Sequence, residues 1–141
     1  MAHLKTVSAT TKTWSELSAD VIAVGIFSGG KLTPMAKDVD EVVVGQLRSA
    51  IKRGDISGRA GETKLFYGKN HRLMLDGLGE KKKLDLEQVR RASGTVARTA
   101  ISNKLATVLM EDFAQDKEDA AQAQAEGVIL GSYQFLSLIH I

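Results

Sequence analysis

The run Val21-Ile22-Ala23-Val24-Gly25-Ile26-Phe27 decides the fold class of this 141-residue chain. It is almost continuously apolar and rich in β-branched residues, which is typical of a strand that is buried on both faces of a sheet. Asp20 precedes the run and Ser28-Gly29-Gly30 follows it, so turn-forming residues mark both ends. Because such a strand needs helices on both sides of its sheet, we expect an α/β domain.

The segments on either side of this strand fit the same architecture. Upstream, residues 3–9 are rich in Thr and Val, which suits a neighbouring or edge strand. Downstream, Thr33-Pro34 is a favourable helix start, because the hydroxyl can cap free amides and proline is tolerated in the first turn. Apolar residues then recur at steps of three and four, which predicts one helix that ends near Gly54: Val39, Val42, Val43, Leu47, Ala50 and Ile51.

Two short apolar runs follow, over residues 63–67 and 72–75. Gly68-Lys69-Asn70-His71 separates them, and Gly and Asn both tolerate positive φ, so we expect a β-hairpin. Farther on, Asp85 with Gln88 forms a capping box at the start of another amphipathic helix. Its apolar face comprises Leu86, Val89, Ala92, Val96, Ala100 and Ile101.

The last part of the chain completes the alternation of strands and helices. A buried strand is expected over residues 105–110, and a final helix from about Asp116 to Ile129. The predicted order is β-β-α-β-β-α-β-α, with right-handed crossovers that place helices on both faces of a mixed sheet. The sequence therefore predicts a three-layer α/β/α sandwich.

Composition excludes several classes of protein. The chain is 43% hydrophobic and 26% charged, unlike disordered or collagen-like chains. No apolar stretch approaches the roughly 18 residues of a membrane span, and residues 1–5 do not begin a signal peptide. With no cysteine, disulfides and thiolate chemistry are impossible. A net charge of +2 is too small to imply nucleic-acid binding by itself. We expect a soluble, cytoplasmic protein.

Two glycine-rich segments could present backbone amides to a phosphate group. Gly77-Leu78-Gly79 is expected between a strand and a helix, but Lys82 stands where a dinucleotide fingerprint has its third glycine. Ser28-Gly29-Gly30-Lys31 follows the first buried strand, without the Gly-Lys-Ser/Thr order of a phosphate loop. A tight turn and a flexible connection are the favoured interpretations, because the usual task of glycine is to permit strained backbone.

Metal-binding and nucleophilic patterns are weak. The three histidines lie in remote parts of the chain and have no metal-ligand spacing: His3, His71 and His140. A group of carboxylates could hold magnesium or calcium, although the helix dipole alone favours acidic residues at a helix start: Glu111, Asp112, Asp116, Glu118 and Asp119. No serine lies in a Gly-x-Ser-x-Gly elbow. We therefore assign no catalytic, cofactor-binding or metal-ligating residue.

Positive charge gathers around one predicted helix. Lys81-Lys82-Lys83 precedes it, and Arg90, Arg91 and Arg98 lie within it. A contact with RNA or DNA is one interpretation, but a charged face turned to solvent is the more usual one.

A set of motifs resembles a known family. In chain order they are Leu32-Thr33-Pro34, Arg53-Gly54-Asp55, Gly58-Arg59-Ala60-Gly61-Glu62, Gly77-Leu78-Gly79-Glu80-Lys81-Lys82, Val89-Arg90-Arg91-Ala92-Ser93-Gly94 and Ala125-Glu126-Gly127-Val128-Ile129-Leu130-Gly131-Ser132-Tyr133-Gln134-Phe135. In this register, over residues 4–135, the chain resembles the N-terminal domain of the leucyl (cytosol) aminopeptidase family. Gln134 stands where that family usually has a basic residue.

The resemblance implies a macro-domain-like α/β/α sandwich. It also implies a parent enzyme that is a homo-hexamer and removes N-terminal residues from peptides with two divalent metals, zinc or manganese. In that family the metal ligands and the catalytic Lys and Arg lie in a larger C-terminal domain, within motifs such as Asn-Thr-Asp-Ala-Glu-Gly-Arg. Those motifs are absent here, so Ala125-Glu126-Gly127 is not the ligand motif.

The leading hypothesis is an isolated, non-catalytic N-terminal domain over residues 1–135 that is inactive alone. Its partners would be the C-terminal catalytic domain and other subunits. Residues 136–141 are apolar where the family has charged residues, so we expect a non-native or disordered tail that could drive dimerisation. Two alternatives stay open: a macro-like module that binds nucleotide or ADP-ribose near the two glycine-rich segments, and a DNA-binding domain.

Overall fold

The computed structural model describes residues 19–41, 43–113 and 122–130. Its mixed sheet has five strands: β1 (Val21–Phe27), β2 (Lys31–Leu32), β3 (Thr63–Tyr67), β4 (Arg72–Gly79) and β5 (Val108–Met110). The structure also has three labelled α-helices and one short 3-10 helix: α1 (Pro34–Asp40), α2 (Gln46–Arg53), η2 (Lys81–Lys83) and α3 (Leu86–Ser102). A further helix covers residues 122–130.

Strand β1 lies in the middle of the sheet. It is parallel to β4 on one side and to β5 on the other, and the short strand β2 pairs antiparallel with its carboxyl end. Strand β3 pairs antiparallel with the outer side of β4. The observed sheet is therefore mixed, as the sequence predicts.

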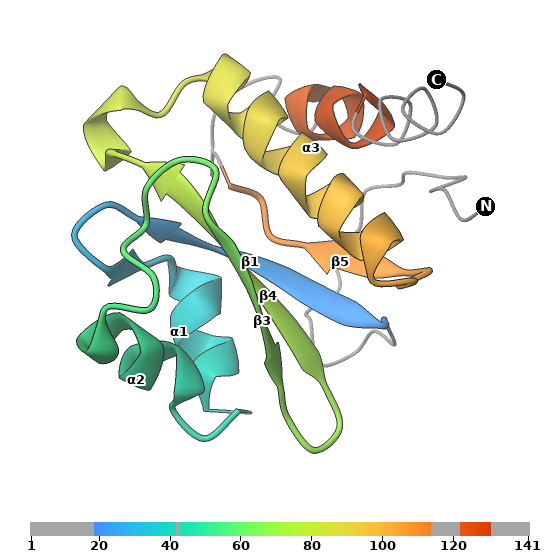
Figure 1. The fold of residues 1–141 in the computed structure, drawn as a ribbon. Coiled ribbons are helices and arrows are strands. Elements are labelled where there is room, and N and C mark those ends of the chain that lie inside the picture. The colour runs from blue at the N-terminus through green and yellow to red at the C-terminus, as the bar shows by residue number, and fades with distance from the viewer. Residues whose placement is uncertain (1–18, 42, 114–121, 131–141) are drawn as a thin grey trace.

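Helices cover both faces of this sheet (Figure 1). Helices α1 and α2 lie on one face, and α3 lies on the other with the helix over residues 122–130 beside it. The side chains of β1 alternate between two cores, as a strand buried on both faces requires. Val21 and Ala23 join the cluster that includes α3, whereas Ile22 and Val24 join the cluster that includes α1 and α2. The three-layer α/β/α sandwich is confirmed.

The two predicted helix starts that lie in the described residues are confirmed. The Thr33 hydroxyl accepts a hydrogen bond from the amide of Ala36, with proline in the first turn, and Asp85 accepts one from the amide of Gln88. The single helix predicted up to Gly54 is wrong, because the segment forms two helices.

The break between α1 and α2 has a backbone cause. Val44 and Gly45 both have positive φ, 57° and 76°, and Val44 is 90% exposed. A β-branched residue is costly in that conformation, and apolar spacing does not reveal it.

The predicted hairpin is confirmed by the β3–β4 pairing, and Gly68 donates to the carbonyl of His71 across its turn. Two strand boundaries differ from the prediction. Strand β4 continues to Gly79, because β1 pairs with it along its length, so Gly77-Leu78-Gly79 belongs to the strand rather than to a turn after it. The strand predicted over residues 105–110 is restricted to β5, and β2 was not predicted.

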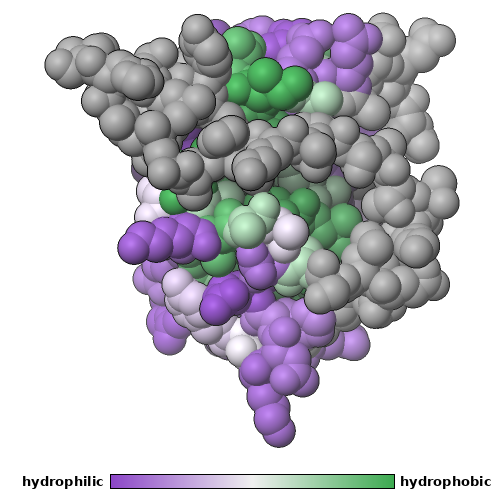
Figure 2. Space-filling view, turned by 90° about the vertical axis from the view of Figure 1, so that its right-hand side faces the viewer, coloured by the Kyte–Doolittle hydropathy of each residue, from purple (hydrophilic) through white to green (hydrophobic). Residues whose placement is uncertain are grey.

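Three expectations lie outside the described residues: the strand over residues 3–9, the helix start near Asp116, and the tail over residues 136–141. On the face of the molecule seen in Figure 2, hydrophobic residues gather near the centre and hydrophilic residues lie below them. Within the described part of the chain, no helix combines the length and the apolar character that crossing a membrane requires.

Candidate functional site

The loop over residues 55–62 lies against the carboxyl ends of β1 and β4. The amide of Gly77 donates to the carbonyl of Glu62 (2.8 Å), and that of Gly79 to the carbonyl of Gly58 (2.9 Å). The amide of Gly30 donates to the carbonyl of Ser57 (3.1 Å). These amides are already paired within the chain, so they cannot cradle a phosphate group as the glycine-rich segments suggested.

Glycine is required where this loop meets the strands. A Cβ atom at Gly77 would lie 1.9 Å from the carbonyl oxygen of Arg59. One at Gly58, whose φ is +98°, would lie 2.2 Å from the carbonyl oxygen of Phe27. Both distances are far below van der Waals contact, so the glycines here permit close backbone approach.

Glu62 holds the loop in shape from within. Its Oε1 accepts hydrogen bonds from the amides of Ser57 (3.2 Å), Gly58 (2.9 Å) and Arg59 (2.7 Å), and from the Ser57 hydroxyl (2.8 Å). Partial burial raises the pKa of Glu62, but these hydrogen bonds outweigh it and hold the pKa below its usual range.

A groove of about 690 Å³ opens at the carboxyl ends of β1 and β5. Phe27 and Phe113, which end or follow these strands, are among its lining residues, although both are almost fully buried. Its other apolar lining comes from β2, α2 and the segment after η2, and cations stand among these residues: Lys31, Lys37, Arg48, Lys52 and Lys81. The ammonium group of Lys81 lies 5.9 Å above the centre of the Phe27 ring.

Glu111 stands just behind this groove and ties three elements together. Its Oε1 accepts hydrogen bonds from the Thr33 hydroxyl (2.6 Å) and from the amide of Gly25 (3.0 Å). Burial raises the pKa of Glu111, although hydrogen bonds from Thr33, Gly25 and the amide of Met35 oppose that rise. This carboxyl group therefore joins β1 to the start of α1.

Asp76 is the other buried carboxyl group of the sheet that titrates abnormally. It lies on β4, between Gly25 of β1 and Thr63 of β3. Within the described part of the chain, neither carboxyl oxygen has a hydrogen-bond partner. Burial raises the pKa of Asp76 to about 8, and the nearby Thr63 hydroxyl offsets only part of that rise.

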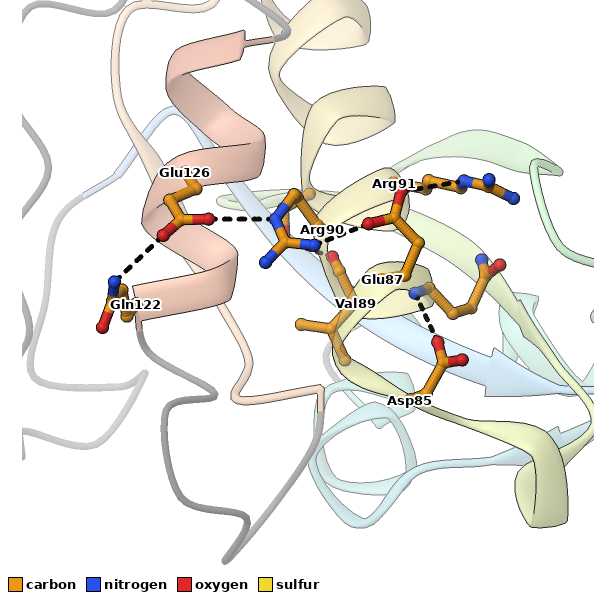
Figure 3. A network of polar contacts seen from close by, with 9 residues as sticks. Asp85, Glu87, Val89, Arg90, Arg91, Gln122 and Glu126 are labelled. Atoms are coloured by element: carbon orange, nitrogen blue, oxygen red, sulfur yellow. Dashed lines mark hydrogen bonds and ion pairs between the residues drawn. The ribbon is translucent and has the colours of Figure 1, made fainter.

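On the far face of the sheet, Arg90 connects α3 to the helix over residues 122–130 (Figure 3). Its guanidinium group donates to Glu126 of that helix (3.0 Å) and to Glu87 of its own (2.6 Å). A Cβ atom at Gly127 would lie 2.1 Å from the carbonyl oxygen of Arg90, so the two helices touch through their backbones. Ala125-Glu126-Gly127 thus serves helix packing.

Comparison with known proteins identifies the family. A family model described as "Cytosol aminopeptidase family, N-terminal domain" matches residues 23–138, which is most of the chain. The chain belongs to this family.

Curated relatives agree with this assignment. A probable cytosol aminopeptidase from Thermosynechococcus vestitus is 34% identical over 137 residues, which cover 91% of this chain and 27% of that protein. The cytosol aminopeptidase of Pseudomonas aeruginosa is 32% identical over 124 residues, covering 82% and 25%. Among the leading relatives, the chain spans 19–28% of their length.

Solved structures show the same fold. A mutant of tomato leucine aminopeptidase has a TM-score of 0.75 at 22% identity, over 94% of this chain and 29% of that chain. The macrodomain of Mycobacterium tuberculosis DarG has a TM-score of 0.64 at 9% identity, over 96% and 91%. The fold is therefore the macro-domain-like one that the resemblance implied.

The structure brings four of the six family motifs together in two pairs. The motif from Gly58 to Glu62 packs on Gly77-Leu78-Gly79 at the end of the sheet. The motif from Val89 to Gly94 packs on Ala125-Glu126-Gly127. These family motifs therefore maintain close contacts within the domain.

Among the described residues, the other candidates do not form a site. His71 lies in the hairpin turn, and His3 and His140 lie outside the described residues. Of the carboxylate cluster, only Glu111 and Asp112 are described, and no group of three metal-ligating side chains occurs in the described ranges. Much of the charge near α3 is paired with carboxylates through Lys83, Arg90 and Arg91.

The groove was not predicted from the sequence. Its cations come from β2, α1, α2 and η2, which are separated along the chain. One signal was present, since Arg48 and Lys52 are four residues apart and so share one face of α2. Without the position of η2, this spacing did not point to a groove.

Proposed function

We propose that this chain is a non-catalytic N-terminal domain of a cytosol aminopeptidase, the enzyme being one that removes N-terminal residues from peptides. The observation that carries the proposal is the match of residues 23–138 to the N-terminal domain of that family. The two divalent metals, zinc or manganese, would be held by the larger remaining part of the enzyme. The names of the relatives support a cytosolic location for that enzyme.

Within the enzyme, the domain would pack against the catalytic domain and other subunits of a homo-hexamer, and so shape access to the active site. The chemistry of the described residues supports a structural role. Glu111 and Glu62 hold backbone and hydroxyl groups of this chain, and Glu126 holds Arg90. These carboxylates therefore stabilise the domain rather than face one another across a metal site. We propose residues 1–135 as the domain and 136–141 as a non-native or disordered tail.

Hydrolysis of leucine amide tests the proposal. The purified chain, incubated with manganese or zinc, is expected to release no ammonia above the rate of metal alone. The Pseudomonas aeruginosa cytosol aminopeptidase, assayed in parallel, supplies the positive control. Metal-dependent turnover by this chain that survives repurification would overturn the proposal.

The two alternatives are less well supported. Nucleotide binding at the glycine-rich segments would need amides that the loop over residues 55–62 already occupies. DNA binding along α3 would need basic groups that face solvent unpaired, whereas Arg90 and Arg91 both pair with Glu87.

A further inference from the structure

Strand β3 forms one edge of the sheet (Figure 1). In the described part of the chain it pairs with β4 on one side and with no strand on the other. Its five residues, Thr63–Tyr67, keep a regular antiparallel register with β4. An edge strand presents a row of unpaired amides and carbonyl groups, which makes it a template for pairing with another strand.

Hydrogen bonds at the two ends of the hairpin show which backbone groups of β3 face outward. The carbonyl of Glu62 accepts from the amide of Gly77, and the amide of Gly68 donates to the carbonyl of His71. The even-numbered residues of this segment therefore face β4. Because residues of an antiparallel strand alternate in the side to which their backbone groups point, the odd-numbered residues face away from β4.

The outward-facing residues are Thr63, Leu65 and Tyr67. A side chain outside the sheet, that of Gln46, donates to the carbonyl oxygen of Tyr67 (3.0 Å), as this direction requires. Among the described residues, the amide and carbonyl groups of Thr63 and Leu65 and the amide of Tyr67 have no hydrogen-bond partner. The edge of β3 is therefore free to accept another strand.

The side chains of β3 protect this edge only weakly. Natural proteins protect edge strands with proline, bulges and charged side chains. Strand β3 has no proline and a regular register, and its one charged residue is Lys64, whose ammonium group lies 4.0 Å from a carboxylate oxygen of Asp55. Tyr67 is 61% exposed. Exposed tyrosine is common at protein interfaces, because its ring is apolar and its hydroxyl group is polar.

We propose that two copies of this chain associate by antiparallel pairing of their β3 strands, with the two-fold axis at Leu65. In this register Leu65 lies opposite its counterpart in the second copy, and Thr63 lies opposite Tyr67. All the outward amides and carbonyl groups of β3 then find partners. The same surface serves both copies, which is the usual arrangement in symmetric dimers.

The neighbouring registers are less favourable. A two-fold axis at Lys64 would set the two lysine side chains directly opposite one another, and like charges in such positions destabilise a strand pair. An axis at Phe66 would leave Thr63 outside the paired residues. The axis at Leu65 sets Lys64 opposite Phe66 instead, so no like charges oppose one another directly. Because β3 complements itself in this way, we assign a second copy as the occupant of the edge.

This inference does not rest on the proposed function, because it concerns a strand edge of this chain alone. It also differs from association through residues 136–141, which lie outside the described residues. A chain that lacks residues 136–141 separates the two interfaces. It is expected to dimerise as the full chain does, because β3 is retained.

Sedimentation equilibrium at increasing protein concentration measures the association. The full chain is expected to show a monomer–dimer equilibrium. Leu65→Lys and Leu65→Glu should each raise the dimer dissociation constant by about tenfold or more, because like charges then meet at the axis. An equimolar mixture of the two variants should restore dimers, because opposite charges meet there. The control Lys69→Glu, in the loop between β3 and β4, should dimerise as the wild type does.

The register can be tested directly because the chain has no cysteine. Leu65→Cys is expected to form a disulfide-linked dimer under mild oxidation. Residues that face one another in a hydrogen-bonded pair have Cα atoms about 5.5 Å apart, which is within the range of disulfides. Lys69→Cys is the matched control and should form cross-links much more slowly. Circular dichroism checks that each variant folds, and the cysteine pair keeps the proposal testable if a charged variant does not.

Three results would overturn the proposal. They are a full chain that stays monomeric up to about 1 mM, association that disappears when residues 136–141 are removed, and equal cross-linking of Leu65→Cys and Lys69→Cys. None of them bears on hydrolysis of leucine amide, so failure here is distinguishable from failure of the proposed function.

Discussion

Two regions of the sheet bury a carboxyl group, and their surroundings differ. Asp76, in the middle of β4, is 1% exposed, and Glu111, just after β5, is 5% exposed. Burial raises the pKa of both. Glu111 receives hydrogen bonds from Thr33 and Gly25, whereas Asp76 has no hydrogen-bond partner among the described residues. The two carboxyl groups are therefore similarly buried but differ in their hydrogen-bond partners.

The hydrogen-bond partners decide which of the two carboxyl groups stabilises the folded domain. Hydrogen bonds to Glu111 offset part of its desolvation and satisfy donors that would otherwise be buried unpaired, although burial still raises its pKa. Asp76 keeps its proton to a higher pH, because the Thr63 hydroxyl stabilises its charged form too weakly to offset the desolvation. We therefore expect Glu111 to stabilise the domain and Asp76 to destabilise it, increasingly as the pH rises.

The largest expected effect is the pH dependence that Asp76 imposes. Its pKa is about 8 in the folded state, against 3.8 for an unperturbed aspartate carboxyl group. The folded state therefore binds one more proton than the unfolded state between these values, and its stability falls as the pH rises through this window. The free energy of unfolding should fall by about 1.4 kcal/mol per pH unit near the middle of the window. Urea unfolding at several pH values measures this slope.

Asp76→Asn is the matched control, because the side chain keeps its size and cannot ionise. Its unfolding free energy should lack this component of the pH slope, and the variant should exceed the wild type in stability at about pH 8. Asp76→Val gives a second test without any polar atom. If all three proteins show the same slope, the proton is not held by Asp76.

A smaller effect is expected at Glu111. Glu111→Leu roughly keeps the volume but removes the acceptor of the buried Gly25 amide, and it leaves the Thr33 hydroxyl with the carbonyl oxygen of Gly25 as its remaining acceptor. That change should lower the free energy of unfolding by about 2 kcal/mol. Glu111→Gln retains an acceptor oxygen and should lose less. Thermal and urea unfolding at about pH 7 compare the two variants, and an equally large loss in both would show that charge, not hydrogen bonding, is what matters.

The fold was largely predictable from the sequence because its signals are local. The β-branched run of β1, the cap at Thr33 and the hairpin of β3 and β4 act through nearby residues, and the structure confirms each. The positive φ expected of Gly68 and Asn70 in the hairpin turn is wrong. The positive φ of Val44 was not predictable, because a β-branched residue rarely adopts that conformation. Apolar periodicity continues through the break and hides it.

The candidate site was much less predictable, because its residues meet only through tertiary contacts. Gly77-Leu78-Gly79 has the composition of a phosphate-binding turn, yet its amides bond to the loop that carries Glu62. Glu111 was noted among acidic residues near a helix start, whereas its partners Gly25 and Thr33 are about 80 residues earlier in the chain. A sequence pattern identifies donors and acceptors but not their pairing across such separations.

The smallest expected effect concerns Glu62, which extends the comparison to a carboxylate with several partners but little burial. Glu62→Ala removes the acceptor for the amides of Ser57, Gly58 and Arg59. Water can replace that acceptor at this open site, so the loss should be only about 1 kcal/mol. Because hydrogen bonds lower the pKa of Glu62 below the 4.5 of an unperturbed glutamate, its contribution is present above that value and disappears as the pH falls through the folded pKa. Wild type and Glu62→Ala should therefore converge in stability in acid, and Glu62→Gln should fall between them at about pH 7. If Glu62→Ala lowers the free energy of unfolding as much as Glu111→Leu does, the number of hydrogen-bond donors to a carboxyl group matters more for stability than its burial.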